Sequence, residues 1–148
     1  MSGLNELYQQ VIVDHNKKPR NWGTLEGRTH YAEGINPLCG DHIFLDMIIS
    51  SKIIEDVSFQ GESCAICKSS ASIMTTILKN NQVDASQKLF DQFRSFIKGD
   101  IQIDDPKMLN KFLVFSGIRD LPSRVKCAIL PWHTFNAAIN NNHSTSTE

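Results

Sequence analysis

The sequence predicts an α+β domain, in which a small antiparallel sheet of about three strands is covered by helices on one face. Two observations support this fold class. Strand-like alternation of apolar residues is confined to about residues 28–60, and from about residue 65 onward the apolar residues have helical spacing only. Strands followed by helices are typical of α+β domains. We expect one domain over residues 1–139 and, because residues 140–148 lack apolar periodicity, a disordered C-terminal tail.

An amphipathic helix is predicted over residues 4–16, and Pro19 and Gly23 follow its end. The sheet is predicted from three later segments. Residues 29–36 are weakly strand-like, whereas every second residue from Ile43 to Ile49 is apolar, as in a strand with one buried face. A turn at residues 50–52 then leads to a returning strand over residues 53–59.

Four helices are predicted in the second half of the chain. The first carries its apolar residues over 66–77, and the second spans about residues 89–97. The sequence Asp104-Asp105-Pro106 starts the third, since proline is favoured at the first helical position. Pro122 starts the last helix, inside which Pro131 predicts a kink.

Composition and charge exclude several classes of partner. Hydrophobic residues make up 41% of the chain, charged residues 21%, and the formal net charge is −1, so no basic field attracts nucleic acid. No apolar run approaches the roughly 20 residues that span a bilayer. The N-terminus has no signal-peptide pattern. We expect a cytoplasmic protein, a monomer or weak homo-oligomer, with no nucleic-acid or membrane partner.

Four cysteines and one aspartate carry the chemistry of the chain: Cys39, Asp41, Cys64, Cys67 and Cys127. They lie in three separate segments, so folding must bring them together. Thiolates and a carboxylate are ligands for a soft or borderline metal, and zinc and iron–sulfur clusters are the usual occupants. A disulfide scaffold is the weaker alternative, because disulfides are rare in the cytosol and four cysteines are too sparse.

The local contexts of these residues favour reactivity over packing. Cys39 and Asp41 flank Gly40 in a turn, where side chains two apart can converge. Cys64 stands at a strand-to-helix junction, where the helix dipole favours a thiolate. Cys127 lies on the last helix. The alternative is a pair of buried cysteines and a surface aspartate.

Three basic residues lie within four positions of a ligand candidate: Lys68, Arg124 and Lys126. They can offset the net negative charge of three thiolates and a carboxylate around a divalent cation, or form a solvated face. Arg124 is preferred, because it is one helical turn from Cys127.

Two further residues leave alternatives open. Cys64 and Cys67 form a C-x-x-C sequence, the spacing of zinc ribbons and of thioredoxin-like redox sites, although the βαβ context of the latter is missing. Cys67 is therefore a spare ligand, a resolving thiol or a small packed residue. His42 neighbours Asp41, but in a strand its side chain points to the opposite face.

Motifs along nearly the whole chain resemble the iron–sulfur cluster assembly scaffold family, which includes IscU, the NifU N-terminal domain and SufU. The matching motifs are Leu7-Tyr8-Gln9-Gln10-Val11-Ile12-Val13-Asp14-His15, Lys18-Pro19-Arg20-Asn21, Asn36-Pro37-Leu38-Cys39-Gly40-Asp41, Phe59-Gln60-Gly61-Glu62-Ser63-Cys64-Ala65-Ile66 and Leu121-Pro122-Ser123-Arg124-Val125-Lys126-Cys127. Together these motifs are highly specific.

Two features resemble the SufU-like subgroup. The 62 residues between Cys64 and Cys127 leave room for an extra helical segment near 100–117, and Lys126 stands where IscU-type members have a histidine. Arg124 also matches the SufU pattern. Cys67 departs from the family, since a serine is expected there.

The resemblance implies a zinc site made by Cys39, Asp41, Cys64 and Cys127, and a cysteine desulfurase as partner. The expected function is to accept persulfide sulfur from that desulfurase and to assemble or relay it toward a transient [2Fe–2S] cluster for apo iron–sulfur target or carrier proteins. Cys39, on a loop, is the first candidate for the sulfur acceptor and Cys127 the second. The alternatives are a zinc-dependent sulfurtransferase that activates the desulfurase without holding a cluster, and a structural zinc-binding interaction domain.

Overall fold

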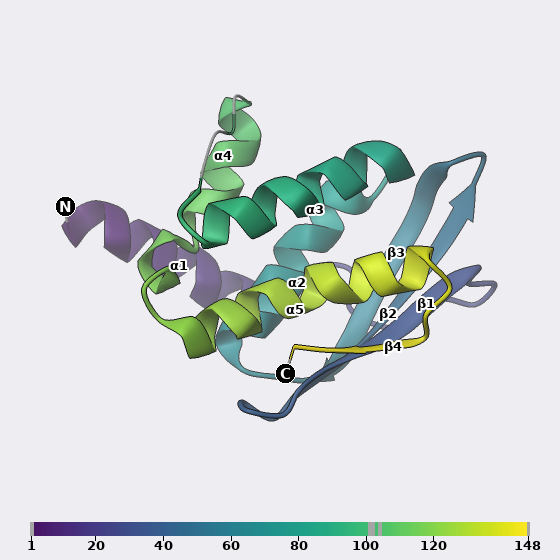
Figure 1. The fold of residues 1–148 in the computed structure, drawn as a ribbon, viewed down its shortest axis with the longest axis horizontal. Coiled ribbons are helices and arrows are strands. Elements are labelled where there is room, and N and C mark those ends of the chain that lie inside the picture. Colours follow the sequence, from purple (N-terminus) through teal and green to yellow (C-terminus); the bar gives the residue numbers. More distant parts are fainter. Residues whose placement is uncertain (1, 101–102, 104, 148) are drawn as a thin grey trace.

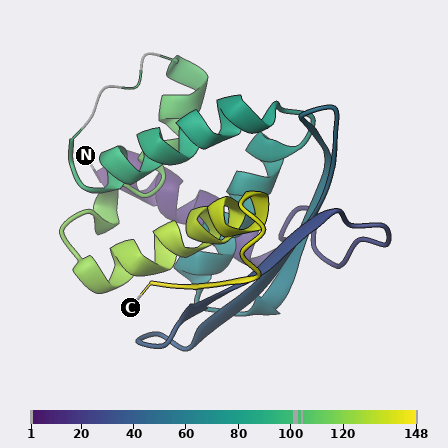
Figure 2. The same cartoon turned by 45° about the vertical axis from the view of Figure 1, so that its right-hand side comes forward.

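The computed structural model describes residues 2–100, 103 and 105–147, and in these residues it confirms an α+β fold with five α-helices and one small sheet. In chain order the elements are α1 (Ser2–Lys17), β1 (His30–Asn36), β2 (Asp41–Ser50), β3 (Ile53–Glu62), α2 (Ala65–Leu78), α3 (Val83–Ile97), α4 (Pro106–Leu113), the 3-10 turn η1 (Ser116–Ile118), α5 (Pro122–Ile139) and β4 (Ser144–Ser146). Figure 1 shows their arrangement, and Figure 2 shows that the helices cover one face of the sheet.

The predicted helices are all present, and most start close to where we expected, but α3 begins at Val83, six residues before the start predicted near residue 89. Asp105 caps α4, because its carboxylate accepts a hydrogen bond from the Lys107 backbone N–H at 3.0 Å, and Pro106 follows as the first helical residue. Asp104, which the sequence places in the same helix start, lies outside the described residues. Pro131 lies inside α5 and is buried, and the kink expected there stays a prediction.

The sheet has four strands rather than three, in the order β3-β2-β1-β4. The three predicted strands pair antiparallel, whereas β4 runs parallel to β1, so the sheet is mixed. Strand β4 comes from the tail that we expected to be disordered, and this expectation is wrong for Ser144–Ser146. Backbone pairing holds the segment, since the Glu33 N–H donates to the His143 carbonyl at 2.9 Å and the Thr147 N–H to the Ile35 carbonyl at 3.1 Å.

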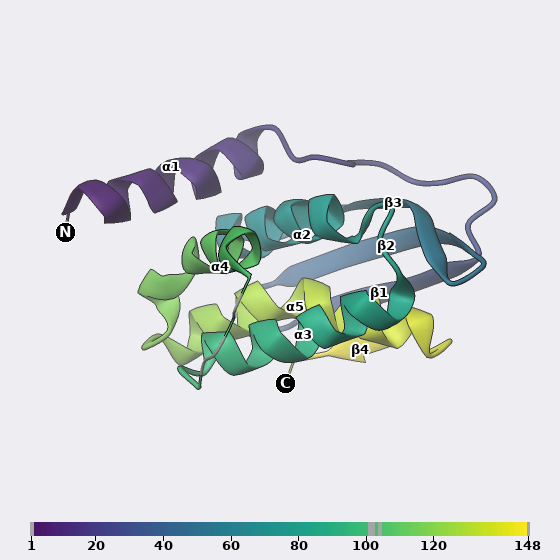
Figure 3. The ribbon, with the colours of Figure 1, turned by 90° about the horizontal axis from the view of Figure 1, so that it is seen from above.

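The core lies between the sheet and the helices. Ile43, Leu45 and Met47 on β2 turn their buried side chains toward the helices, as the alternation predicts. Aromatic side chains from α3, α4 and α5 form its other half, with Phe93 in edge-to-face contact with Phe112 (ring centroids 4.9 Å apart). Helix α2 lies between α1 and α5 (Figure 3), which makes it the centre of the helical layer.

Helix α5 packs directly on β1, and a glycine allows the close approach. A Cβ atom added to Gly34 would collide with the Thr134 hydroxyl and would lie 3.1 Å from a Leu130 methyl group. This contact fixes the height of α5 above the sheet, and Cys127 is two helical turns from Thr134. Among the described residues, no helix is both long enough and apolar enough to cross a membrane.

Candidate metal centre

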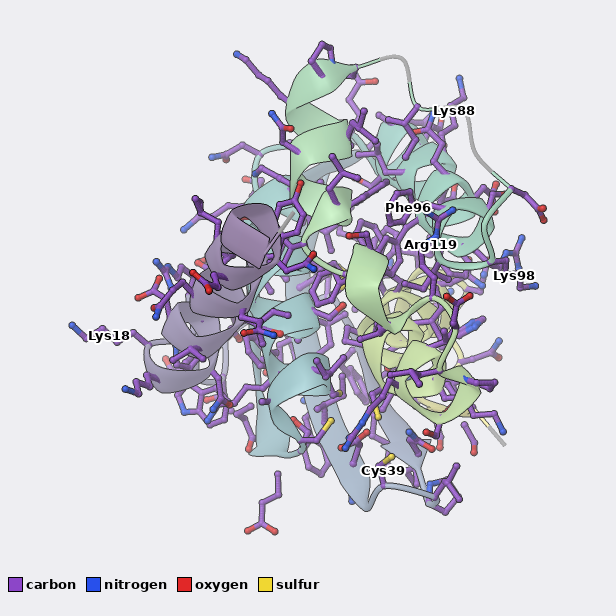
Figure 4. All side chains as sticks on the ribbon, turned by 90° about the vertical axis from the view of Figure 1, so that its left-hand side faces the viewer. Lys18, Cys39, Lys88, Phe96, Lys98 and Arg119 are labelled. Carbon is purple, nitrogen blue, oxygen red and sulfur yellow. The ribbon has the colours of Figure 1, made fainter. Side chains whose placement is uncertain are left out.

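The β1–β2 hairpin brings the first two predicted ligands to one end of the sheet. Asn36 and Asp41 are the last paired residues of its ladder, and residues 37–40 form the turn between them. Gly40 has a φ of +71°, in the left-handed region that glycine adopts at low cost. Cys39, in the turn, is half-buried, and its neighbour Leu38 is 67% exposed. Figure 4 shows Cys39 at this end of the molecule, with sulfur atoms gathered beside it.

The Asp41 carboxylate is buried, and two donors hold it in place. One oxygen accepts a hydrogen bond from the Cys64 backbone N–H at 2.8 Å, and the other accepts one from the Asn36 side-chain amide at 3.2 Å. The residue is only 1% exposed. The carboxylate therefore joins the hairpin to the start of α2 and faces the sulfur atoms with a fixed orientation.

Cys64 is the residue that caps α2, as its position at the strand-to-helix junction predicts. Its sulfur accepts a hydrogen bond from the Cys67 backbone N–H at 3.4 Å, the contact that an N-cap side chain makes with the third helical residue. The same sulfur lies 4.0 Å from an Asp41 carboxylate oxygen. Cys64 is half-buried, whereas the neighbouring Asp41 is buried.

Cys127 reaches the same point from α5. Its sulfur lies 3.2 Å from the Cys39 sulfur and 3.5 Å from the amide nitrogen of Asn36, and its side chain is fully buried. Folding thus brings together all four predicted ligands, although they come from the β1–β2 turn, the start of β2, the start of α2 and the first turns of α5.

The donor set fits a zinc ion or an iron–sulfur cluster. One donor atom each from Cys39, Asp41 and Cys127 lies within 4.8 Å of the other two, and Cys64 adjoins this group through Asp41. Three sulfurs and one oxygen are a donor set that suits tetrahedral zinc. Asn36 gives a second indication of a binding site. Its buried side-chain amide oxygen has no hydrogen-bond partner among the described residues, so it is available to a bound group.

Electrostatics at this point favour a bound cation. Burial, then hydrogen bonding to Cys39 and Cys64 and the charges of Cys64 and Asp41, raises the pKa of the Cys127 thiol well above its usual range. Thiols and a carboxyl group that lie this close together oppose each other's ionisation, because each negative charge disfavours the next. A divalent cation removes that opposition, because it binds the thiolate forms directly.

The predicted supporting cations lie in different surroundings. Hydrogen bonding to the Cys127 sulfur, followed by the charge of Cys64, raises the pKa of the Arg124 guanidinium, so Arg124 faces the site as expected. Lys126 instead lines a surface cavity of about 430 Å³ with His133 and other residues, on another side of α5. Lys68 places its ammonium group over the Trp22 ring, 4.7 Å from the centroid.

The histidines lie away from the ligand group. His42 forms a 2.8 Å contact with the Glu33 carboxylate and stacks on Phe44, which places it on the opposite face of the sheet from the helices. His15 is hydrogen-bonded to Ser72 at 2.7 Å, and burial lowers its pKa. The position of His42 agrees with the side-chain direction that strand alternation predicts.

Asn36 is the one residue at the site whose role sequence reasoning missed. It is 1% exposed, and its amide contacts both Asp41 and Cys127. A signal was present, since an asparagine followed by proline stands three residues before Cys39. Its role depends on strand register, however, because the Asn36 amide reaches the Asp41 carboxylate only when these two residues are paired across the hairpin.

Comparison with known proteins gives a consistent result. The profile of the family described as NifU-like N terminal domain matches residues 7–128. The chain is 36% identical over 138 residues to a zinc-dependent sulfurtransferase SufU of Bacillus subtilis, covering 93% of this chain and 92% of that protein. It is 33% identical to an iron–sulfur cluster assembly scaffold protein IscU of Streptococcus pyogenes, covering 94% and 86% of the two chains.

Solved structures agree with this result. A putative iron–sulfur cluster assembly scaffold protein for the SUF system, from Fervidobacterium islandicum, superposes with a TM-score of 0.81 at 28% identity, covering 88% of this chain and 94% of that one. The N-terminal part of a NifU-like protein from Brucella abortus has a TM-score of 0.83 at 16% identity, covering 94% and 96%, and supports the fold alone.

Proposed function

The chain belongs to the NifU-like N-terminal domain family, and on this premise we propose that it is an iron–sulfur cluster assembly protein. It accepts persulfide sulfur from a cysteine desulfurase and assembles or relays it toward a [2Fe–2S] cluster. Cys39, Asp41, Cys64 and Cys127 form the site. The observation that carries the proposal is the convergence of three donor groups within 4.8 Å of one another, with Cys64 beside them.

Cys39 is the favoured sulfur acceptor. Its side chain is half-buried on a turn at the edge of the molecule, whereas Cys127 is fully buried. The Cys39 thiolate attacks the outer sulfur of the desulfurase persulfide, a new S–S bond forms at Cys39, and the desulfurase cysteine leaves as a thiolate. The persulfide proton stays on the transferred sulfur, so the step needs no external oxidant or reductant. Access and nucleophilicity of the attacking thiolate set its rate.

The same four residues would hold a resting Zn²⁺ ion, which keeps thiolates deprotonated when bound. Asp41 is the hardest of the four donors and the least suited to a soft metal. The Asn36 amide and the Cys64 N–H hold its carboxylate in place. We assign Asp41 the role of weakening the hold on a finished cluster, which then passes to an apo target or carrier protein.

A second candidate function is a zinc-dependent sulfurtransferase that never holds a cluster. The Bacillus subtilis relative favours it, because that protein carries this name and matches over nearly the full length of both chains. The two candidates share the sulfur-transfer step and differ in the fate of the transferred sulfur. A structural zinc domain is a third alternative, and it would tolerate no loss of a ligand without unfolding.

Anaerobic native mass spectrometry separates these functions. The protein is incubated with a cysteine desulfurase, cysteine and ferrous iron, and its intact mass is measured. A species with bound iron and sulfide in equal number supports cluster assembly. A species that retains zinc, gains sulfur and takes up no iron supports the sulfurtransferase instead. A zinc-bound species that gains neither sulfur nor iron contradicts both cluster assembly and sulfur transfer. The structural zinc domain is then the function that remains.

A further inference from the structure

Cys67 brings a fourth thiol to the metal centre, and the proposed function gives it no role. It lies in the first turn of α2 and is fully buried. It belongs to a small apolar cluster with Ile43, Cys127 and Leu130, separate from the main core. Cys39 and Cys64 pack against this cluster, so every cysteine of the chain contributes to one patch of the structure.

Cys67 and Cys64 are joined at the start of α2, and the spacing of the two residues is that of a C-x-x-C metal motif. Cys64 is the capping residue and Cys67 the third residue of α2, so their side chains share one face of the first turn. The Cys67 N–H also donates to the Cys64 sulfur at 3.4 Å. Two cysteines separated by two residues commonly bind one tetrahedral metal ion.

Asp41 is the weakest member of the donor set, and its place can be taken by sulfur. Its carboxylate is a hard oxygen donor beside three sulfur atoms, although hydrogen bonds from Asn36 and from the Cys64 N–H orient it. Soft ions and iron–sulfur clusters favour ligation by four thiolates. The Cys67 thiol packs in one cluster with Cys127, against which Cys64 also lies, so it is the additional thiol closest at hand for this purpose.

We propose that Cys67 is a reserve ligand that replaces Asp41 and converts a site of three thiolates and one carboxylate into a site of four thiolates. This inference rests on the metal site of the proposed function. In the exchange the Cys67 sulfur bonds to the metal ion and releases its proton to solvent, and the Asp41 carboxylate leaves as an anion. The metal ion keeps its oxidation state. The chain then has a labile mode of binding through Asp41 and a tighter one through Cys67.

Titration with Co²⁺ tests this, because the intensity of the sulfur-to-cobalt absorption bands rises with the number of thiolate ligands. Four proteins are compared: the unsubstituted chain, Cys67→Ser, Asp41→Ala and the double variant Asp41→Ala/Cys67→Ser. We expect Asp41→Ala to bind Co²⁺ with stronger sulfur bands than the unsubstituted chain. The double variant should bind about 10–100-fold more weakly than Asp41→Ala, the usual loss when support for a metal ligand is removed.

The controls separate the possible failures. Cys67→Ser alone should still bind Co²⁺, because Asp41 is present, but with sulfur bands no stronger than those of the unsubstituted chain. Equal affinity and equal bands for Asp41→Ala with and without Cys67 would overturn the reserve-ligand role. A chain that binds no Co²⁺ in any form would overturn the proposed metal site itself.

Folding is checked by circular dichroism, and Cys67→Ala replaces Cys67→Ser if the serine variants do not fold. Cadmium NMR of Asp41→Ala then gives an answer that leaves Cys67 in place, because the chemical shift reports the number of sulfur ligands. A shift typical of four sulfurs supports the proposal, and a shift typical of three contradicts it.

Discussion

The amide nitrogen of Asn36 lies 3.2 Å from a carboxylate oxygen of Asp41, across the last residue pair of the β1–β2 ladder. The same nitrogen lies 3.5 Å from the Cys127 sulfur, so one buried side chain connects the hairpin to α5. Loss of a residue that orients metal ligands typically lowers metal affinity by about 10–100-fold. Asn36 has this position in the structure.

Asn36→Ala should therefore lower zinc affinity by about 10–100-fold, because Asp41 and Cys127 lose their shared donor. Competition with a chromophoric chelator measures the change. Asn110→Ala, on α4 and outside the site, is the matched control and should keep the affinity of the unsubstituted chain. Unchanged zinc binding in Asn36→Ala would remove the orienting role.

Asp41→Ala should hold an assembled cluster longer than the unsubstituted chain. The change removes the hardest donor and leaves only thiolates around the iron. The decay of the visible absorption of the cluster after transfer to a chelator measures its lifetime. Decay at the rate of the unsubstituted chain would show that Asp41 does not control release.

Cys39→Ser should abolish sulfur uptake and leave the fold intact. Cys39 lies half-buried on a turn and contributes to the edge of the small cysteine cluster instead of the main core. Intact mass after incubation with desulfurase and cysteine reports the uptake, and thermal unfolding reports the fold. Cys67→Ser is the matched control and should still gain sulfur. An unfolded Cys39→Ser protein would instead support the structural zinc domain.

Gly34→Ala should destabilise the protein by about 1–3 kcal/mol, the usual cost of inserting an atom into a packed contact. The added Cβ would collide with the Thr134 hydroxyl, so α5 would have to move away from β1. Urea unfolding measures the change. Gly117→Ala is the control, because a Cβ there meets no atom within 4 Å. Equal unfolding free energies of the two variants would contradict the close packing of α5 on β1 at Gly34.

Stability should fall as the pH drops below the ordinary histidine pKa, about 6.5. Burial, followed by the charge of Arg20, lowers the pKa of His15, and burial also lowers that of His133. A lowered pKa means that the unfolded chain binds the proton first. The stabilising contribution is thus complete above about pH 6.5 and is lost as the pH falls toward the folded-state value.

Urea unfolding at a series of pH values between neutral and mildly acidic checks this pH dependence. His15→Gln should flatten the fall in unfolding free energy, and a further His133→Gln substitution should flatten it more. A pH profile identical to that of the unsubstituted chain in the double variant would show that other groups cause the acid sensitivity.

The parts of the fold that the sequence predicts are those with a local signal. Helix α2 begins directly after its cap Cys64, and α4 directly after its cap Asp105, because caps and prolines act within one turn. Strand β2 follows from strict alternation. Strand β4 has no such signal. Its residues are serine and threonine. Backbone pairing with β1 holds it in place, together with the stacking of the His143 ring on the Tyr31 ring, whose centroids are 4.2 Å apart.

The site divides in the same way. Residue types and motifs are enough to select Cys39, Asp41 and Cys127 as ligand candidates, whereas the direction of each side chain depends on tertiary geometry. Lys126 adjoins Cys127 in sequence but lies about 100° further around α5, and it lines a different surface. The orienting role of Asn36 needed the hairpin register, which sequence patterns leave open.

Strand β4 also covers part of a sheet edge that would otherwise be open. An uncovered strand edge offers a row of unpaired N–H and carbonyl groups to another chain, and this is a common route to aggregation. Along β1 the segment Ser144–Ser146 pairs with Glu33–Ile35, and this short polar segment is itself a poor template for a further strand. Residues 144–146 thus act as a hydrophilic cover over this part of the sheet edge.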